Sequence, residues 1–187
     1  MRTLIASAGL LTLTLSVAGA DGAGSSATPV PDSSRARMVA PPAERLVAIF
    51  PGYCHAAELA GPFPCLGVYS SADSLLGYVG WSDLAGTTAR GYGGPVPVRV
   101  FVAPDGAILD FDLLDNCETP SYFRLVFGGD FRARLTAWQP GQEAPDAVSM
   151  ATSSSAAIIE GVTGTVQRIL AEVIGPPAEA DGRRPPR

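Results

Sequence analysis

The chain has 187 residues, which fits one domain with a sizeable core, and no feature of it indicates a second domain. Its formal net charge is −5, so it is not expected to bind nucleic acid or an anionic membrane surface, because both depend on basic side chains. All 13 basic residues are arginines and the single histidine is His55, which excludes a Schiff-base lysine, a Walker-type phosphate loop and a histidine metal cluster within this chain.

The first 20 residues have the order typical of a secretory signal peptide. Arg2 supplies a positive start, residues 4–17 are an apolar run, and residues 18–20 are a small-residue cleavage site. A retained membrane anchor is the alternative, but the run is shorter than the roughly 20 apolar residues that span a bilayer. We therefore predict a cleaved signal peptide and an exported protein.

Two further segments have the composition of disordered chain. Residues 21–41 are rich in Gly, Ser, Ala, Pro and Asp, and residues 176–187 are rich in Pro, Ala and Arg. Neither segment is expected to carry chemistry. These limits leave residues 42–175 as the predicted folded domain.

The predicted domain begins with a short helix at residues 43–50, which Pro51-Gly52 ends. A loop is expected at residues 53–64. Cys54 and Cys65 flank this loop and could close a disulfide in an exported protein, but spacing alone does not fix the pairing. Cys117 would be left over.

Strands are predicted in the middle of the chain. Residues 66–70 and 75–81 have strand composition and are separated by a short polar turn. Residues 96–102 and 109–113 alternate between apolar and other side chains on either side of a Pro-Asp-Gly turn, which predicts an antiparallel pair with one buried face. Asp110 and Asp112 would then face solvent on the other side.

Helices are predicted to follow the strands. Residues 121–135 suggest one or two short helices that Gly128-Gly129 breaks, and Trp138 is expected to pack at the edge of the core. Residues 156–174 have apolar side chains at three- and four-residue steps, which predicts a helix that buries one stripe against the sheet. That stripe is Ala156, Ile159, Val162, Val166, Ile169 and Val173. The predicted fold class is α+β: a small antiparallel sheet packed by a C-terminal helix and short helices in a single domain.

Residues 146–155 are the stretch that indicates a function. They hold small residues and hydroxyls after an acidic residue, directly before the predicted closing helix. The first N–H groups of a helix have no partner within it, and the helix dipole favours negative charge there, so such a start suits phosphate. The alternative is an ordinary helix cap, in which Thr152 or a neighbouring serine satisfies the first turn.

Residues 146–152, Asp-Ala-Val-Ser-Met-Ala-Thr, resemble the flavinylation motif of the FMN-binding domain family. That family includes subunits of the sodium-pumping NADH:quinone reductase and of the Rnf complex, and membrane regulators of nitrous-oxide and nitrite reduction. In these proteins a flavin transferase joins FMN through its phosphate to the final Thr. The resemblance implies that Thr152 is the acceptor here. Met150 stands where the family usually has Gly, and a side chain there could crowd the approaching phosphate.

Three other blocks extend the resemblance to residues 75–173. Residues 91–96 resemble the family's Gly-Tyr-x-Gly opening, residues 105–108 its Asp-Gly-x-Ile turn, and residues 118–120 its Glu-Thr-Pro loop beside the flavin ring. The resemblance implies the following site residues. Asp146 belongs to the attachment motif; Ser149, Ala151 and the backbone after Thr152, beginning with Ser153, surround the phosphate; Gly91, Tyr92, Glu118 and Thr119 border the ring. Tyr92 would either stack on the flavin or only pack in its turn.

The resemblance implies a function in electron transfer. We expect an exported, periplasmic or otherwise extracytoplasmic domain with covalent FMN on Thr152, which carries electrons between membrane and extracytoplasmic redox proteins. It would be a carrier rather than an enzyme with its own substrate, would need a flavin transferase for maturation, and would touch the membrane only through partners. The alternatives are a flavin-free sensor or scaffold of the same fold and a flavin reductase with non-covalent FMN.

Overall fold

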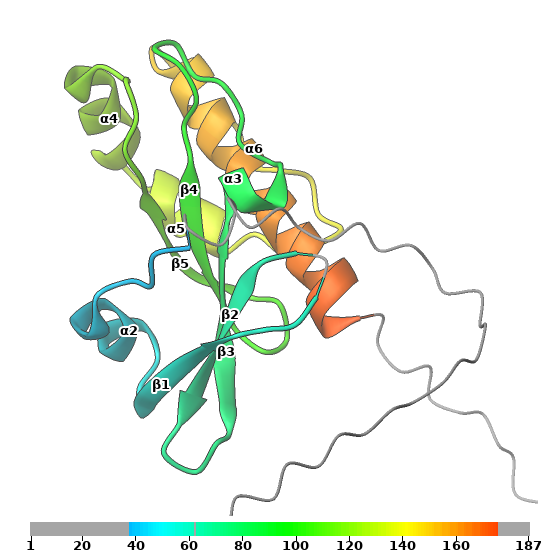
Figure 1. Cartoon of the computed structure of the whole chain (residues 1–187). Helices are drawn as coiled ribbons and strands as arrows, with labels where there is room; N and C mark the ends of the chain where they lie inside the picture. Colours follow the sequence, from blue (N-terminus) through cyan, green and yellow to red (C-terminus); the bar gives the residue numbers. More distant parts are fainter. Residues whose placement is uncertain (1–37, 62, 176–187) are drawn as a thin grey trace, which may run out of the picture.

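The computed structural model describes residues 38–61 and 63–175 (Figure 1). The predicted signal peptide, the predicted tail and most of the predicted linker therefore lie outside the described residues. None of the helices within the described ranges is long and apolar enough to cross a membrane.

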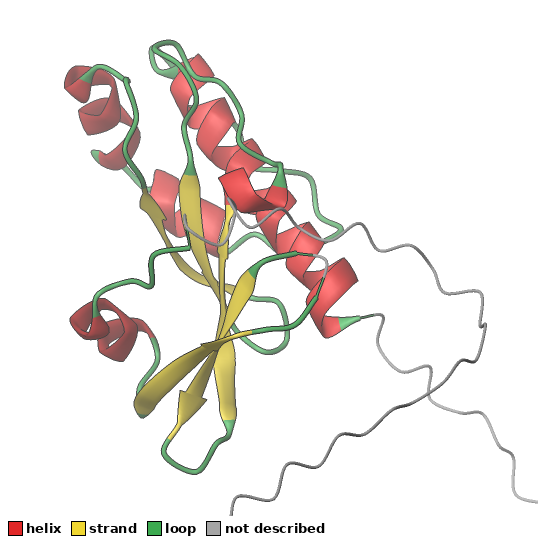
Figure 2. Cartoon of the chain, in the orientation of Figure 1, coloured by secondary structure: helices red, strands yellow, loops and turns green. Residues whose placement is uncertain are grey.

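The centre of the fold is one five-stranded sheet in which each strand pairs with the next strand along the chain. All four pairings are antiparallel (Figure 2). The strands are β1 (Tyr53–Glu58), β2 (Cys65–Ser70), β3 (Leu75–Trp81), β4 (Val98–Val102) and β5 (Ile108–Leu113). The hairpins β2–β3 and β4–β5 confirm two predictions, whereas the predicted loop at residues 53–64 is wrong in its first half, which forms β1.

Helices flank the sheet. They are α2 (Ala43–Ile49), α3 (Ser82–Ala85), α4 (Pro120–Phe127), α5 (Phe131–Thr136) and α6 (Thr152–Ile169), which continues into a π-helical turn η1 (Leu170–Ile174). The predicted N-terminal helix, the break between α4 and α5 and the closing helix are all present. Trp138 is buried as predicted, and its indole N–H donates to the carbonyl of Gln142 at 3.2 Å. The α+β fold class and the single domain are confirmed.

The sheet is buried on both faces, and Figure 1 shows α6 and α2 on opposite sides of it. On one face, Val98 and Val100 pack in a core that includes Ile158 and Val162 of α6. On the other face, Phe101 packs in a second core. The other members of that core are Leu46 and Phe50 from and beside α2, and Leu66, Val68, Val79 and Trp81 from β2 and β3. The prediction of a single buried face for β4 is therefore wrong, because α2 folds back over the second face.

Asp110 and Asp112 do not form a solvated strand face, which corrects a second prediction. Arg45 of α2 reaches across the sheet and donates to Asp110 and Asp112, each at 2.7 Å, while Arg99 donates to Asp112 at 2.6 Å. Arg132 pairs with Asp110 from the side of α5. The two carboxylates are about one-fifth exposed. They join α2 and α5 to the sheet.

A β-bulge changes which side chains of β5 enter the core. Phe101 pairs with Asp110 but Val102 pairs with Ile108, so Leu109 is an extra residue on the strand. Ile108 and Phe111 are buried, whereas Leu109 is 40% exposed. The predicted alternation of Leu109 and Phe111 on one face is interrupted for this reason.

The three cysteines are free thiols, and the register of the first hairpin explains why Cys54 and Cys65 do not pair. Cys54 lies beside the pairing of Tyr53 with Ser70, whereas Cys65 is at the opposite end of β2. Five residues of strand separate these ends by about 16 Å, and a disulfide needs Cα atoms within about 7 Å. Cys65 is buried, and burial raises the pKa of its thiol to about 12.

The closing helix begins at Thr152, four residues before the predicted start. Ala156 is exposed, whereas Ile159, Val162, Val166 and Ile169 of the predicted stripe are buried. An added Cβ at Gly161 would lie 3.1 Å from the Val98 side chain, and one at Gly164 would lie 3.0 Å from Thr87. These glycines let α6 approach the sheet and the residues after α3 closely.

Candidate functional site

The start of α6 is held by the loop before it. Ala151 is the N-cap residue and makes no side-chain cap bond. Ser155, one turn into the helix, accepts a hydrogen bond from the Val148 N–H at 2.8 Å and donates to the Ala151 carbonyl at 2.9 Å. The Thr152 hydroxyl donates to the Val148 carbonyl at 3.4 Å. Ser155 therefore fastens the loop. Neither Thr152 nor a neighbouring serine caps the first N–H groups of α6, so the alternative of an ordinary side-chain cap is wrong.

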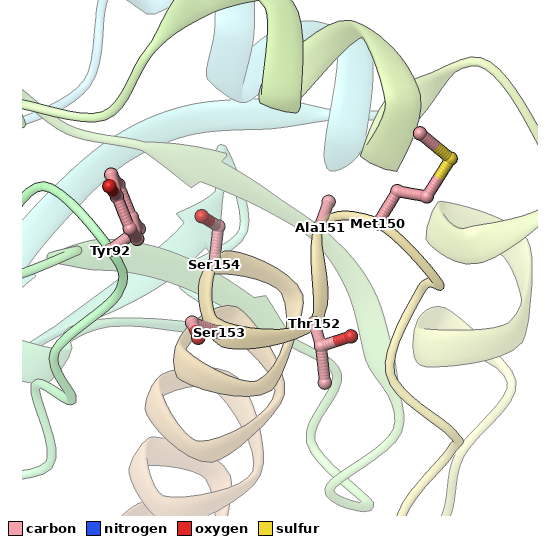
Figure 3. A pocket seen from close by; sticks show the side chains of 6 residues that line it. All are labelled: Tyr92, Met150, Ala151, Thr152, Ser153 and Ser154. Atoms are coloured by element: carbon pink, nitrogen blue, oxygen red, sulfur yellow. The ribbon is translucent and has the colours of Figure 1, made fainter.

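A pocket of about 240 Å³ opens at this helix start (Figure 3). It is lined by Tyr92, Met150, Ala151, Thr152, Ser153 and Ser154. Tyr92 comes from the loop before β4, and Figure 3 shows it across the pocket from the start of α6. Tyr92 is 76% exposed, so an aromatic ring stands at the mouth of the pocket. Thr152 and Ser153 are exposed on the helix side.

Ser154 connects the pocket to a buried carboxylate. Glu118 is 7% exposed, and its Oε2 accepts a hydrogen bond from the Ser154 hydroxyl at 2.5 Å. Its Oε1 accepts a hydrogen bond from the Gly93 N–H at 2.6 Å. The carboxylate thus lies between the start of α6 and the loop that carries Tyr92, behind the pocket rather than in its lining.

The structure separates the predicted site residues into two groups. Tyr92, Ala151, Thr152 and Ser153 line the pocket, together with Ser154, which the sequence did not single out. The others lie outside the lining: Gly91 in the Tyr92 loop, Glu118 behind that loop, Thr119 at the start of α4, and Asp146 and Ser149 in the exposed loop before α6. The run of hydroxyls in residues 152–155 is the signal by which Ser154 could have been found.

Met150 has a backbone conformation that favours Gly, the residue usual at this position of the motif that residues 146–152 resemble. Its φ is 67°, a left-handed conformation that costs a residue with a side chain about 1–2 kcal/mol and costs Gly little. The side chain is 82% exposed and, in Figure 3, extends away from Ser153 and Ser154. Met150 also lines the pocket, and its backbone conformation is one that Gly adopts more easily.

Met150→Gly is expected to raise the free energy of unfolding by about 1 kcal/mol, because Gly adopts a positive φ without the Cβ clash. Thermal or urea unfolding measures the change. Met150→Ala is the matched control, since it shortens the side chain but keeps the Cβ and should show no such gain. Equal stabilisation by Ala and Gly would show that the Met side chain, and not the backbone, is the source of strain.

The geometry of the pocket defines a class of ligand-binding domain. A small α+β domain with an uncapped helix start, a cluster of hydroxyls and an exposed aromatic ring can hold a phosphorylated ligand that has a planar group. Residues 91–167 match the family model of the FMN-binding domain, the family that the sequence resembles. No curated protein matches the chain. The match runs from the Tyr92 loop through β4 and β5 into α6, so it contains every residue that lines the pocket.

The residues present fit the phosphate end of FMN. The first N–H groups of α6 lack a side-chain cap, and Thr152 and Ser153 place hydroxyls beside them. Tyr92 lines the same pocket from the opposite side, where its aromatic ring could meet a planar group. Among the described residues no group of three His, Cys, Asp or Glu side chains could hold a metal ion.

Proposed function

We propose that the protein carries FMN in a phosphoester bond to Thr152 and acts in extracytoplasmic electron transfer. One observation supports this most: Thr152 is the exposed first residue of α6, and its side chain lines a pocket at a helix start that no side chain caps. A hydroxyl in this place is accessible to a modifying enzyme. A phosphate attached to it would meet the positive end of the helix dipole, which stabilises negative charge.

Each pocket residue has a part in this proposal. The Thr152 hydroxyl oxygen would lose its proton and bond to the flavin phosphorus, while the phosphate-linked leaving group of the donor flavin departs from that phosphorus. The N–H groups of Ser153 and Ser154 would stabilise the phosphate oxygens. Tyr92 covers one side of the ring system at the mouth of the pocket. The flavin, when bound, supplies the redox chemistry, and the protein supplies attachment and electrostatic tuning.

The proposed location of the protein and its proposed partners rest on the sequence. The predicted signal peptide and the resemblance to flavinylated domains support an exported carrier that a flavin transferase matures and that exchanges electrons with membrane or extracytoplasmic redox proteins. Covalent attachment suits such a carrier, because a flavin that dissociates freely would be lost outside the cytoplasm.

The proposal is tested by the intact mass and visible spectrum of the full chain co-expressed with a flavin transferase and then precipitated with acid. The expected result is a yellow pellet whose protein is heavier by one FMN less one water. Yellow colour that passes into the supernatant would indicate the reductase alternative with non-covalent FMN. A colourless, unmodified protein, under conditions that flavinylate another family member, would support the flavin-free scaffold.

A further inference from the structure

Glu118 touches both walls of the pocket although it does not line it. Its two carboxylate oxygens accept hydrogen bonds from Gly93, beside Tyr92, and from Ser154, in the first turn of α6. These partners are 25 and 36 residues from Glu118 along the chain. One side chain therefore links the loop that carries Tyr92 to the helix turn that carries Thr152.

The backbone of Glu118 is itself anchored to the sheet. Its N–H donates to the side-chain oxygen of Asn116 at 3.0 Å, and the Asn116 side-chain amide donates to the Leu114 carbonyl at 2.8 Å. The Leu114 N–H in turn donates to the Pro97 carbonyl at 3.0 Å, next to β4. The carboxylate is thus held from a rigid element and reaches out to two less regular ones.

The Tyr92 loop is shaped to lie against Glu118. An added Cβ at Gly91 would lie 2.4 Å from Oε1 of Glu118, and one at Gly93 would lie 2.3 Å from the carbonyl oxygen of Cys117. Contacts this short do not occur for real side chains, so only glycine permits this approach. The glycines on either side of Tyr92 are explained by close contact with Glu118 and with the Cys117 carbonyl before it.

Glu118 also brings charge to the back of the pocket. Among the described residues no arginine lies within ion-pair distance of it, and its charge is balanced by the Gly93 N–H, the Ser154 hydroxyl and the nearby N-terminal end of α6. A buried carboxylate in such surroundings is screened less than a surface charge. Its field therefore reaches any group bound in the pocket.

We propose that Glu118 is a positioning residue that fixes the Tyr92 loop against the start of α6 and sets the negative potential behind the pocket. The first part rests on contacts of the protein alone. The second part concerns the flavin and rests on the proposed function. The two parts are tested by separate measurements, so that failure of one is distinguishable from failure of the other.

The first measurement is hydrogen exchange of the Gly93 amide in the full chain without flavin. Glu118→Ala is expected to speed exchange about tenfold, the factor that corresponds to one lost hydrogen bond, while Glu118→Gln keeps an oxygen acceptor and retains most of the protection. Glu143→Gln, at an exposed position, should behave as wild type. Unchanged exchange in Glu118→Ala would overturn the positioning role. If that variant does not fold, Ser154→Ala replaces it, and equal exchange in Ser154→Ala and wild type would overturn the coupling of the two walls.

The second measurement is the midpoint potential of the flavin in the loaded protein. Glu118→Gln removes the negative charge with little change of shape, so its potential should be more positive than that of wild type, whereas Glu143→Gln should not shift it. An unshifted potential in Glu118→Gln would overturn the electrostatic part. A wild type that takes up no flavin would contradict the proposed function. The hydrogen-exchange result, which is measured without flavin, would still test the positioning role of Glu118.

Discussion

Thr152→Ala is expected to abolish flavin attachment completely while leaving the fold intact. The substitution removes the hydroxyl oxygen that would bond to phosphorus, and no other side chain is expected to replace it. The stability cost should stay within about 0.5 kcal/mol, because the side chain is exposed and its hydrogen bond to Val148 is long, at 3.4 Å. The measurement is intact mass and visible spectrum after co-expression with a flavin transferase, beside thermal unfolding.

Two variants serve as controls for this experiment. Thr152→Ser keeps a hydroxyl at the first position of α6 and should retain at least part of the modification. Thr163→Ala removes a hydroxyl that bonds to the Ile159 carbonyl further along the same helix, and should be modified as wild type is. Attachment that persists in Thr152→Ala would place the acceptor elsewhere, with Ser153 as the first residue to examine.

Asp112→Asn is expected to lower the free energy of unfolding at neutral pH by about 2–3 kcal/mol. The substitution removes the negative charge that pairs with two arginines in a half-buried network. Arg45 and Arg99 both donate to Asp112, so the loss weakens the attachment of α2 over the second core. Urea unfolding measures the change. A loss below about 0.5 kcal/mol, the range of ordinary surface substitutions, would show that this network does not hold α2 in place.

The same variant should change how stability depends on pH. Burial alone would raise the pKa of Asp112, but the hydrogen bonds and charges of Arg99 and Arg45 outweigh it and lower the pKa below its ordinary value of 3.8. A carboxyl with a lowered pKa in the folded state stabilises the fold above its unfolded pKa, and this contribution is lost as the pH falls through the folded value. Wild type should therefore lose stability below about pH 4 more steeply than Asp112→Asn. Asp115→Asn, at an exposed position, should follow the wild-type curve.

Local pattern was enough to predict most of the elements of the fold. Alternating apolar residues identified β4 and β5, and helical periodicity identified α6, because each pattern reports which side chains one element buries. The second core could not be predicted in this way. It depends on α2 folding back over Phe101 and on Arg45 meeting two carboxylates 65 and 67 residues further along the chain. The bulge at Leu109 likewise depends on the register with β4, which a single strand does not encode.

In the candidate site, too, some features could be predicted from the sequence and others could not. The hydroxyl run after Met150 was visible in the sequence because it lies in one continuous stretch beside a helix start. The resemblance suggested Tyr92 and Glu118, and the structure separates them: Tyr92 lines the pocket, and Glu118 lies behind it. The contacts of Glu118 with Gly93 and Ser154 could not be predicted from local pattern, because they join three segments that are far apart in the sequence.

The exposure of Thr152 at the first position of a complete helix has a consequence for biogenesis. The loop before it is already fastened by Ser155, so the folded domain offers the hydroxyl on its surface without local unfolding. If Thr152 is the acceptor, maturation can follow folding, and a transferase would recognise a finished three-dimensional surface rather than a linear peptide. Synthesis of the chain and loading of the cofactor could then take place in different compartments.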